Sequence, residues 1–125
     1  MNVTLRIGPA EVSIDADTHE QLTNWGAWQT TRGGGGRRVG SAEGRYRAEP
    51  AGPAGVARVD ARRALVVERT IGNPEFPRKA ATLLRHQYVL QADPRATARI
   101  AGVRWGDLGV EFQRAVWTAR NRWQR

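Results

Sequence analysis

A glycine- and proline-rich segment in the middle of the chain most constrains what this sequence can fold into. Residues 32–55 hold the run Gly33-Gly34-Gly35-Gly36, four further glycines and two prolines, with few apolar side chains between them. Such a segment has too little apolar surface to offset the conformational entropy that is lost on ordering. We therefore predict a flexible loop over 32–55, between one ordered region at 1–31 and another at 56–125.

Apolar and polar side chains alternate along residues 1–15. The alternation continues on both sides of Gly8-Pro9, a pair that is typical of a tight turn. This pattern predicts a short β-hairpin, with apolar residues Val3, Leu5, Ile7, Val12 and Ile14. Because two strands alone are marginally stable in water, we expect the hairpin to dock on helices or on a partner.

Start and stop signals predict three helices in the next part of the chain. The first should begin at Thr18, which has capping-box spacing with Gln21, and end near residue 30 or 31. The second runs from the N-cap Asp60 to Gly72, and the third follows Pro77 and ends near residue 90. Their predicted apolar faces are Leu22, Trp25 and Trp28; Ala61, Ala64, Leu65, Glu68 and Ile71; and Ala80, Leu83, Leu84, Gln87 and Tyr88.

The last part of the chain has the spacing of a helix-turn-helix motif. Asp93-Pro94 starts a short helix that ends at Gly102, and a longer helix follows from residue 105 or 106 to Arg122. The longer helix carries the apolar stripe Leu108, Phe112, Ala115, Val116, Ala119 and Trp123. We therefore predict a mainly α fold: a small helical domain with a C-terminal helix-turn-helix at 93–122 and a short N-terminal β-hairpin.

The positive charge is concentrated in the same region. Residues 78–125 carry nine Arg and Lys79 against three acids, a net charge of +7, whereas residues 1–77 carry ten Arg against nine acids, a net charge of +1. A charge segment of this kind, with a sequence pI near 11.4, favours a polyanionic partner, most commonly nucleic acid. A well-solvated basic surface without such a partner is the alternative.

If the motif binds double-stranded DNA, its longer helix enters the major groove and its shorter helix crosses the backbone. The candidate DNA-binding residues are Arg95, Arg99, Arg104, Trp105, Val110, Glu111 and Arg114. Arginine suits guanine edges and phosphates, and Glu111 can accept a hydrogen bond from a cytosine amino group. For Trp105 a staple over the turn is an alternative, and for Asp107 a favourable helix-terminal charge.

Further candidate contacts to a partner or a nucleic acid lie outside this motif face. They are Arg37, Arg38, Arg45, Tyr46, Arg47 and Trp117. Trp117 falls off the apolar stripe, so it either packs on the N-terminal helix or is exposed for a partner.

Several chemistries are excluded. The absence of cysteine rules out disulfides, thiolate catalysis and Cys-based metal sites. His19 and His86 fall on different predicted helices, no carboxylates are paired at a readable spacing, and no Gly-Lys-Ser/Thr follows the glycine run. We therefore predict no enzyme activity, no metal and no cofactor. Without an apolar run of about 18 residues or a signal-peptide core, the chain is expected to be soluble and cytoplasmic, with no membrane partner.

Several short segments, in their order along the chain, resemble the Q-like antitermination proteins of lambdoid phages over about residues 20–120. They are Trp25-Gly26-Ala27-Trp28, Ser41-Ala42-Glu43-Gly44-Arg45-Tyr46-Arg47, Val66-Val67-Glu68-Arg69, Leu84-Arg85-His86-Gln87-Tyr88-Val89 and the C-terminal helix-turn-helix. The Cys-rich, zinc-binding insert of some members is absent here, and the N-terminal hairpin and the four-glycine loop have no counterpart.

The resemblance implies a C-terminal half similar to the promoter-reading fourth region of a sigma factor. It also implies a protein that binds DNA near a phage late promoter, joins paused bacterial RNA polymerase in the host cytoplasm and makes it read through terminators.

Two other functions stay open. A helix-turn-helix repressor or activator would bind DNA equally well, and only readthrough of a terminator separates it from an antitermination factor. A basic protein-interaction module, such as an inhibitor or adaptor, would direct its arginines at an acidic protein surface and add its hairpin to the partner's sheet. For that module, salt-dependent binding to protein and not to DNA is expected.

Overall fold

The computed structural model describes residues 1–31 and 59–124 of the chain. It is mainly helical with a short two-stranded antiparallel hairpin at the N-terminus, which confirms the predicted fold class. The predicted loop over 32–55, with its candidate contacts Arg37, Arg38, Arg45, Tyr46 and Arg47, lies outside the described residues. Among the described residues, none of the helices combines the length and the apolar character that a bilayer crossing requires.

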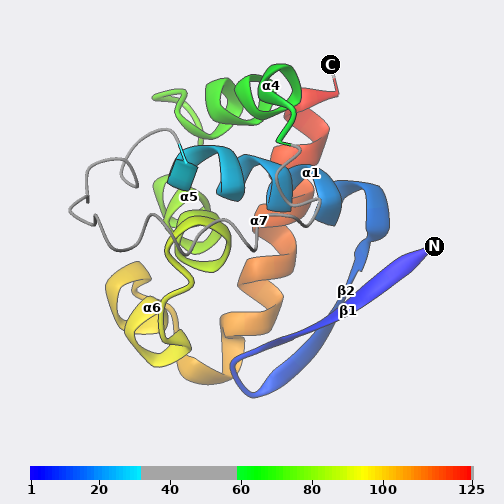
Figure 1. The fold of residues 1–125 in the computed structure, drawn as a ribbon. Helices are drawn as coiled ribbons and strands as arrows, with labels where there is room; N and C mark the ends of the chain where they lie inside the picture. The colour runs from blue at the N-terminus through cyan, green and yellow to red at the C-terminus, as the bar shows by residue number, and fades with distance from the viewer. Residues whose placement is uncertain (32–58, 125) are drawn as a thin grey trace, which may run out of the picture.

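The helices pack around α7, the longest of them (Figure 1). The order of elements is β1 (Asn2–Ile7), β2 (Ala10–Asp15), α1 (Ala16–Gln29), α4 (Ala61–Ile71), α5 (Arg78–Arg85), α6 (Pro94–Ala101) and α7 (Leu108–Trp123). A π-helical turn, His86–Leu90, extends α5, and a 3₁₀ turn, Trp105–Asp107, leads into α7. In Figure 1, α4 lies at the C-terminal end of α7, α6 lies at its N-terminal end, and the hairpin runs along its side.

The hairpin forms as its alternation predicts and docks on α7. Ile7 pairs with Ala10, so Gly8 and Pro9 make the turn, and Gly8 takes the left-handed φ of +64° that favours glycine. Gly109 of α7 permits the close approach, because a Cβ there would lie 3.0 Å from the Cβ of Ala10. The Gln113 side chain also donates a hydrogen bond of 2.7 Å to the carbonyl of Ser13 on β2.

A single apolar core joins the hairpin to all the helices of the described residues. Its largest fully buried side chains are Trp25, Phe112, Leu22, Leu83, Leu84, Leu108 and Val67. The tightest crossing lies between α1 and the π-helical turn, where a Cβ on Gly26 would overlap the backbone carbonyl of Tyr88. Trp25 therefore supplies a core side chain, and Gly26, which has no side chain, allows the backbones of α1 and the π-helical turn to come into contact.

The predicted helix boundaries hold except at the start of α1 and at the start of α7, which begins at Leu108 and not at residue 105 or 106, after the 3₁₀ turn Trp105–Asp107. Asp60 caps α4 by accepting a hydrogen bond from the Arg63 amide, and Gly102 ends α6 with a φ of +73°. The capping box at Thr18 and Gln21 is wrong. The N-cap is Asp15, whose carboxylate accepts hydrogen bonds from the Thr18 amide and hydroxyl at 3.1 and 3.2 Å. The backbone hydrogen bond from Thr18 lowers the pKa of Asp15.

The predicted buried face of α4 is wrong at two positions. Ala64, Val67 and Ile71 are buried, whereas Ala61 and Leu65 are exposed. Val67, and not Leu65, is directed into the core, where it continues the stripe of Ala64 and Ile71 at a spacing of three and four residues. Glu68, which the prediction also placed on the buried face, accepts a hydrogen bond from the Trp25 indole.

Candidate nucleic-acid interface

The short helix, glycine turn and long helix of the predicted motif are present as α6, Gly102 and α7. Gly102 is in the left-handed conformation, and the amide of Val103 donates to the carbonyl of Ala98 at 2.9 Å, which closes the C-terminus of α6. Ala98 is buried, where its small side chain allows close contact of the two helices, and Val103 packs against the core after the turn. A Cβ on Gly102 would meet nothing within 4 Å, so this glycine is needed for its φ angle and not for close packing.

His86 fixes the position of α6 relative to the helix before it. Its Nδ1 lies 3.1 Å from the Thr97 hydroxyl, and Thr97 is one of the few buried polar residues among those described. His19 has a comparable structural contact, 2.9 Å from the phenol of Tyr88. Burial lowers the pKa of His19 and raises that of Tyr88 above its ordinary range. Both histidines therefore tie elements together.

Three arginines form a basic cluster at the N-terminal end of α7, and we call Arg95, Arg99 and Arg104 the α6 cluster. All three are exposed, and Arg95 and Arg99 are one helical turn apart on the same face. Within the described residues, neither of the two ion pairs that are present involves them. The cluster is therefore free to meet an anion.

The Trp105 ring packs against Arg95 of this cluster. The Arg95 guanidinium stacks over its ring, 4.2 Å from the ring centroid, in a cation–π contact worth about 0.5–1 kcal/mol at an exposed site. The ring is half-buried, and a Cβ placed on Gly8 of the hairpin turn would lie 3.4 Å from it. Trp105 thus packs between Arg95 of α6 and the hairpin turn at Gly8, and it joins the motif to the hairpin.

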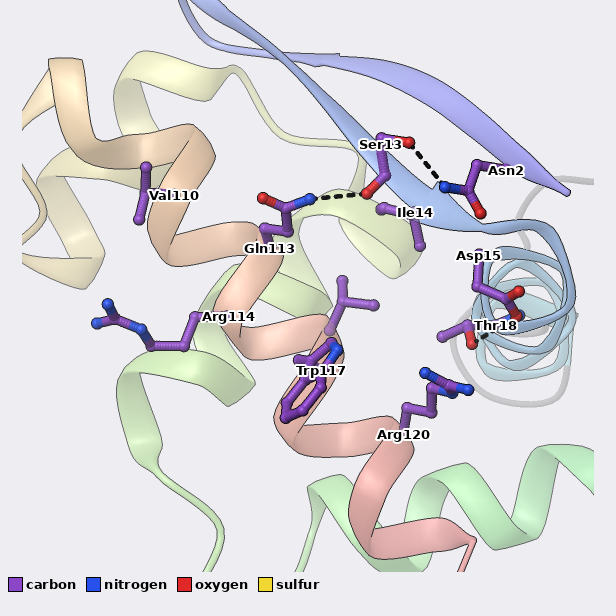
Figure 2. A pocket seen from close by; sticks show the side chains of 11 residues that line it. Asn2, Ser13, Ile14, Asp15, Thr18, Val110, Gln113, Arg114, Trp117 and Arg120 are labelled. Carbon is purple, nitrogen blue, oxygen red and sulfur yellow. Dashed lines mark hydrogen bonds between the residues drawn. The ribbon is translucent and has the colours of Figure 1, made fainter.

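The outer face of α7 presents one narrow ridge, which we call the α7 ridge: Val110, Arg114 and Trp117. These residues are spaced by one helical turn. Val110 and Trp117 are 58% and 60% exposed, and the side chain of Arg114 is 68% exposed. On one side a groove of about 570 Å³ separates the ridge from β2 and the start of α1 (Figure 2). On the other side Arg114 borders a smaller hollow of about 200 Å³, together with Pro77 and Lys79 at the start of α5. The ridge is therefore a part of α7 that a partner can touch.

Arg114 is not an unpaired cation. Its guanidinium lies 3.4 Å from the carboxylate of Glu111, three residues earlier on the helix. An exposed pair of this kind contributes no more than about 1 kcal/mol. Arg114 can therefore exchange Glu111 for a phosphate or a base edge at little cost, and Glu111 would be released at the same time.

The groove beside the ridge contains functional candidates that the sequence reasoning missed. Gln113 and Arg120 line it together with Trp117, and the Nε of Arg120 is buried without a hydrogen-bond partner among the described residues. Their spacing, four and three residues from Trp117, is the signal that could have indicated a shared face. Figure 2 shows Trp117 between Arg114 and Arg120, with Arg120 directed toward Thr18 and Asp15.

The structure separates the predicted site residues into two groups. Arg95, Arg99, Arg104 and Trp105 gather around α6 and the turn, and Val110, Glu111 and Arg114 follow on α7. The alternative in which Trp117 packs on the N-terminal helix is wrong, because Trp117 is 60% exposed. The inward side of α7 at this level is already filled by the small side chains of Ala115, Val116 and Ala119.

No protein-family model, curated protein or solved structure matched this chain.

Proposed function

We propose that this chain is a double-stranded DNA-binding transcription regulator that acts as an antitermination factor on bacterial RNA polymerase. The observation that carries the DNA-binding part is the α6 cluster, three exposed arginines without ion pairs in the described residues, close in the chain to the exposed Val110 of the first turn of α7. In a helix-turn-helix motif the first helix crosses the DNA backbone, where basic side chains can contact phosphates.

The geometry favours a particular orientation on the duplex. β2 borders one side of α7, so the helix turns its ridge, and not its hairpin side, toward a duplex. A major groove about 12 Å wide can receive Val110 and Arg114 at its floor. Arg95 and Arg99 then lie over the phosphates of the flanking backbone, where they position the protein on the duplex and do not read its base sequence. The hairpin turn, against Trp105, lies at the edge of this contact.

Arg95→Ala and Arg114→Ala are expected to weaken DNA binding in different ways. Arg95→Ala should weaken all duplexes alike and lower the salt slope of binding by about one, because it removes a phosphate contact. Arg114→Ala should cost about 1–3 kcal/mol on a preferred site selected from random duplexes, because it removes a contact to a base edge. Fluorescence anisotropy with the selected and a scrambled duplex measures both effects.

Arg62→Ala on α4 is the matched control, because it removes the same charge far from α6 (Figure 1). It should leave affinity for both duplexes nearly unchanged. Equal losses on both duplexes for Arg95 and Arg114 would assign sequence reading to other residues, with Arg104 and Glu111 the next to test.

The antitermination part of the proposal is supported by the resemblance to Q-like proteins. It is tested by transcription in vitro from a template with a promoter-proximal pause and a downstream terminator. We expect readthrough to increase when the protein is added, and to require a higher protein concentration in Arg95→Ala. DNA binding without readthrough would instead identify a repressor or activator.

A basic protein-interaction module is the second candidate, and one observation favours it. Trp117 is largely exposed beside a groove that also contains Arg120, and exposed tryptophan and arginine are the residues that most often dominate protein interfaces. If Trp117→Ala abolishes readthrough while DNA affinity is unchanged, the ridge serves a protein partner. Loss of DNA affinity in the same variant would assign Trp117 to the duplex.

A further inference from the structure

The outer face of α4 carries a second basic surface, made by Arg62, Arg63, Leu65, Val66 and Arg69, which we call the α4 face. Arg62, Leu65, Val66 and Arg69 are spaced by three, one and three residues, so they share one side of the helix. Leu65 and Val66 are 38% and 41% exposed, so both contribute apolar surface to this side of the helix. The five residues line a shallow hollow of about 400 Å³.

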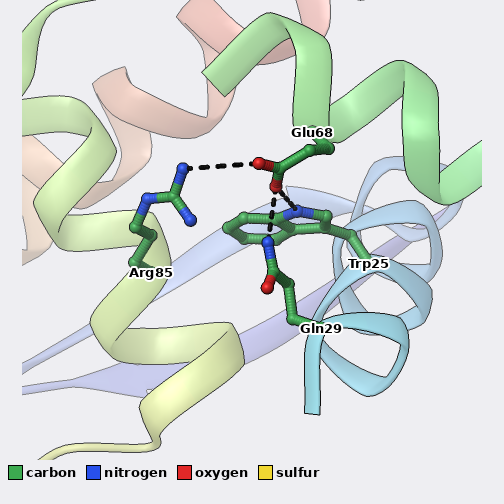
Figure 3. A network of polar contacts seen from close by, with 4 residues as sticks. All are labelled: Trp25, Gln29, Glu68 and Arg85. Atoms are coloured by element: carbon green, nitrogen blue, oxygen red, sulfur yellow. Dashed lines mark hydrogen bonds and ion pairs between the residues drawn. The ribbon is translucent and has the colours of Figure 1, made fainter. Parts of the chain in front are cut away.

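No carboxylate of α4 balances these arginines on the same face. The only acid of the helix is Glu68, which is turned inward. Its Oε1 accepts hydrogen bonds from the Trp25 indole at 2.9 Å and the Gln29 amide at 2.6 Å (Figure 3). Its Oε2 faces the Arg85 guanidinium at 4.0 Å. The α4 face therefore has three positive charges, and within the described residues none of the three side chains has an ion pair.

The mixture of charge and apolar surface indicates which partner fits. Two adjacent aliphatic side chains between arginines gain from burial against another apolar surface, whereas a phosphate backbone offers them none. A second copy of this chain fits poorly, because an isologous contact would bring six arginines together. A partner surface with carboxylates around one or two apolar side chains complements both the positive charge and the apolar surface of the α4 face.

The position of the α4 face leaves it accessible while α6 is occupied. α4 lies at the C-terminal end of α7, and α6 lies at the other end (Figure 1). A partner on the α4 face and a duplex on the α6 cluster would not compete for the same surface.

We propose that the α4 face docks an acidic amphipathic helix of a partner protein. The apolar side chains of that helix pack on Leu65 and Val66, and its carboxylates pair with Arg62, Arg63 and Arg69. This inference does not depend on DNA binding, because none of its residues belongs to the α6 cluster or the α7 ridge.

A labelled acidic peptide tests the proposal directly. The probe is a fluorescein-labelled peptide of about 15 residues, long enough for marginal helicity, with leucines at helical spacing on one face and glutamates elsewhere. Fluorescence anisotropy with the full chain should show saturable binding, weakened about tenfold by Leu65→Ser combined with Val66→Ser. Arg62→Gln combined with Arg69→Gln should weaken it and reduce its salt dependence. All four positions are at the surface, so thermal melts should confirm that these variants stay folded.

Two matched controls make the result specific to α4. Ile100→Ser changes a side chain on α6 that is 64% exposed, and should leave peptide affinity within about twofold of wild type. Arg78→Gln combined with Lys79→Gln removes two exposed charges from the start of α5 and should do the same. Equal weakening by the α4 variants and these controls would overturn the proposal, since the peptide would then bind any basic surface.

Two further outcomes would assign the α4 face to another occupant. If Leu65→Ser and Val66→Ser weaken duplex binding as much as peptide binding, the face belongs to the nucleic acid. If sedimentation shows a wild-type dimer that these changes convert to a monomer, the face belongs to a second copy. A chain that binds the peptide through α4 but binds no duplex would disprove the DNA-binding proposal and leave this one standing.

Discussion

Phe112→Ala is expected to remove about 3–5 kcal/mol of the free energy of unfolding, the range for a fully buried phenylalanine. Phe112 is 1% exposed, and its ring stacks on Tyr88 with centroids 6.1 Å apart. It lies on the inward side of α7, where the hairpin, α5 and the π-helical turn meet. A loss of this size is a large fraction of the stability of a small domain, so the variant should be largely unfolded or strongly destabilised.

Urea unfolding followed by tryptophan fluorescence measures this loss, with Val110→Ala as the matched control on the same helix. Val110 is 58% exposed and should change the free energy of unfolding by less than about 0.5 kcal/mol. If Phe112→Ala unfolds at the wild-type urea concentration, the inward and outward faces of α7 are misassigned, and the proposed ridge with them.

Gly26→Ala is expected to destabilise the fold by about 3 kcal/mol or more, the upper end for overpacked interiors. An added Cβ would overlap the Tyr88 carbonyl oxygen and lie 2.8 Å from its carbonyl carbon. Both obstacles are backbone atoms, so no rotamer change can relieve them. Alanine gains about 1 kcal/mol over glycine in helix propensity, which is too little to compensate. α1 and the π-helical turn must therefore separate.

Gly106→Ala is the control for this substitution. A Cβ on Gly106 would meet nothing within 4 Å, so alanine should be neutral or stabilise the protein by up to about 1 kcal/mol. Thermal unfolding of the two variants should give opposite or clearly unequal shifts in Tm. A Gly26→Ala protein as stable as wild type would mean that the two backbones do not cross as closely as described.

The elements of this fold could be predicted because their signals are local. Proline at residue 94, glycine at residue 102 and the N-cap Asp60 each act through the backbone within one helical turn. The hairpin followed in the same way from alternation around Gly8-Pro9. Fold class and most helix ends therefore needed no knowledge of tertiary contacts.

What could not be predicted depends on contacts between distant residues. On α4, both Leu65 and Val67 fit a helical stripe with Ala64 and Ile71, and only the packing of α4 on α1 and α7 decides that Val67 is buried and Leu65 is exposed. Asp15 ends a strand and caps the following helix at once, and the capping-box pattern at Thr18 concealed this.

In the candidate site, too, the features with local signals could be predicted and those that depend on distant contacts could not. The exposure of Arg95, Arg99 and Arg104 followed from the motif, but the stacking of Arg95 on Trp105 did not. The groove beside Trp117 exists because the hairpin docks along α7, a contact that joins Ser13 to Gln113 across 100 residues. No local signal specifies that pairing.

The salt dependence of duplex binding tests the DNA-binding claim most directly. Anisotropy or mobility-shift titrations of wild-type protein between about 50 and 200 mM salt give the slope of log affinity against log salt concentration. With about five phosphates neutralised by the basic residues of α5 to α7, we expect a slope of about −4 to −5, because each neutralised phosphate contributes roughly 0.9. A slope near zero, or no duplex binding at low salt, would contradict the proposed nucleic-acid interface.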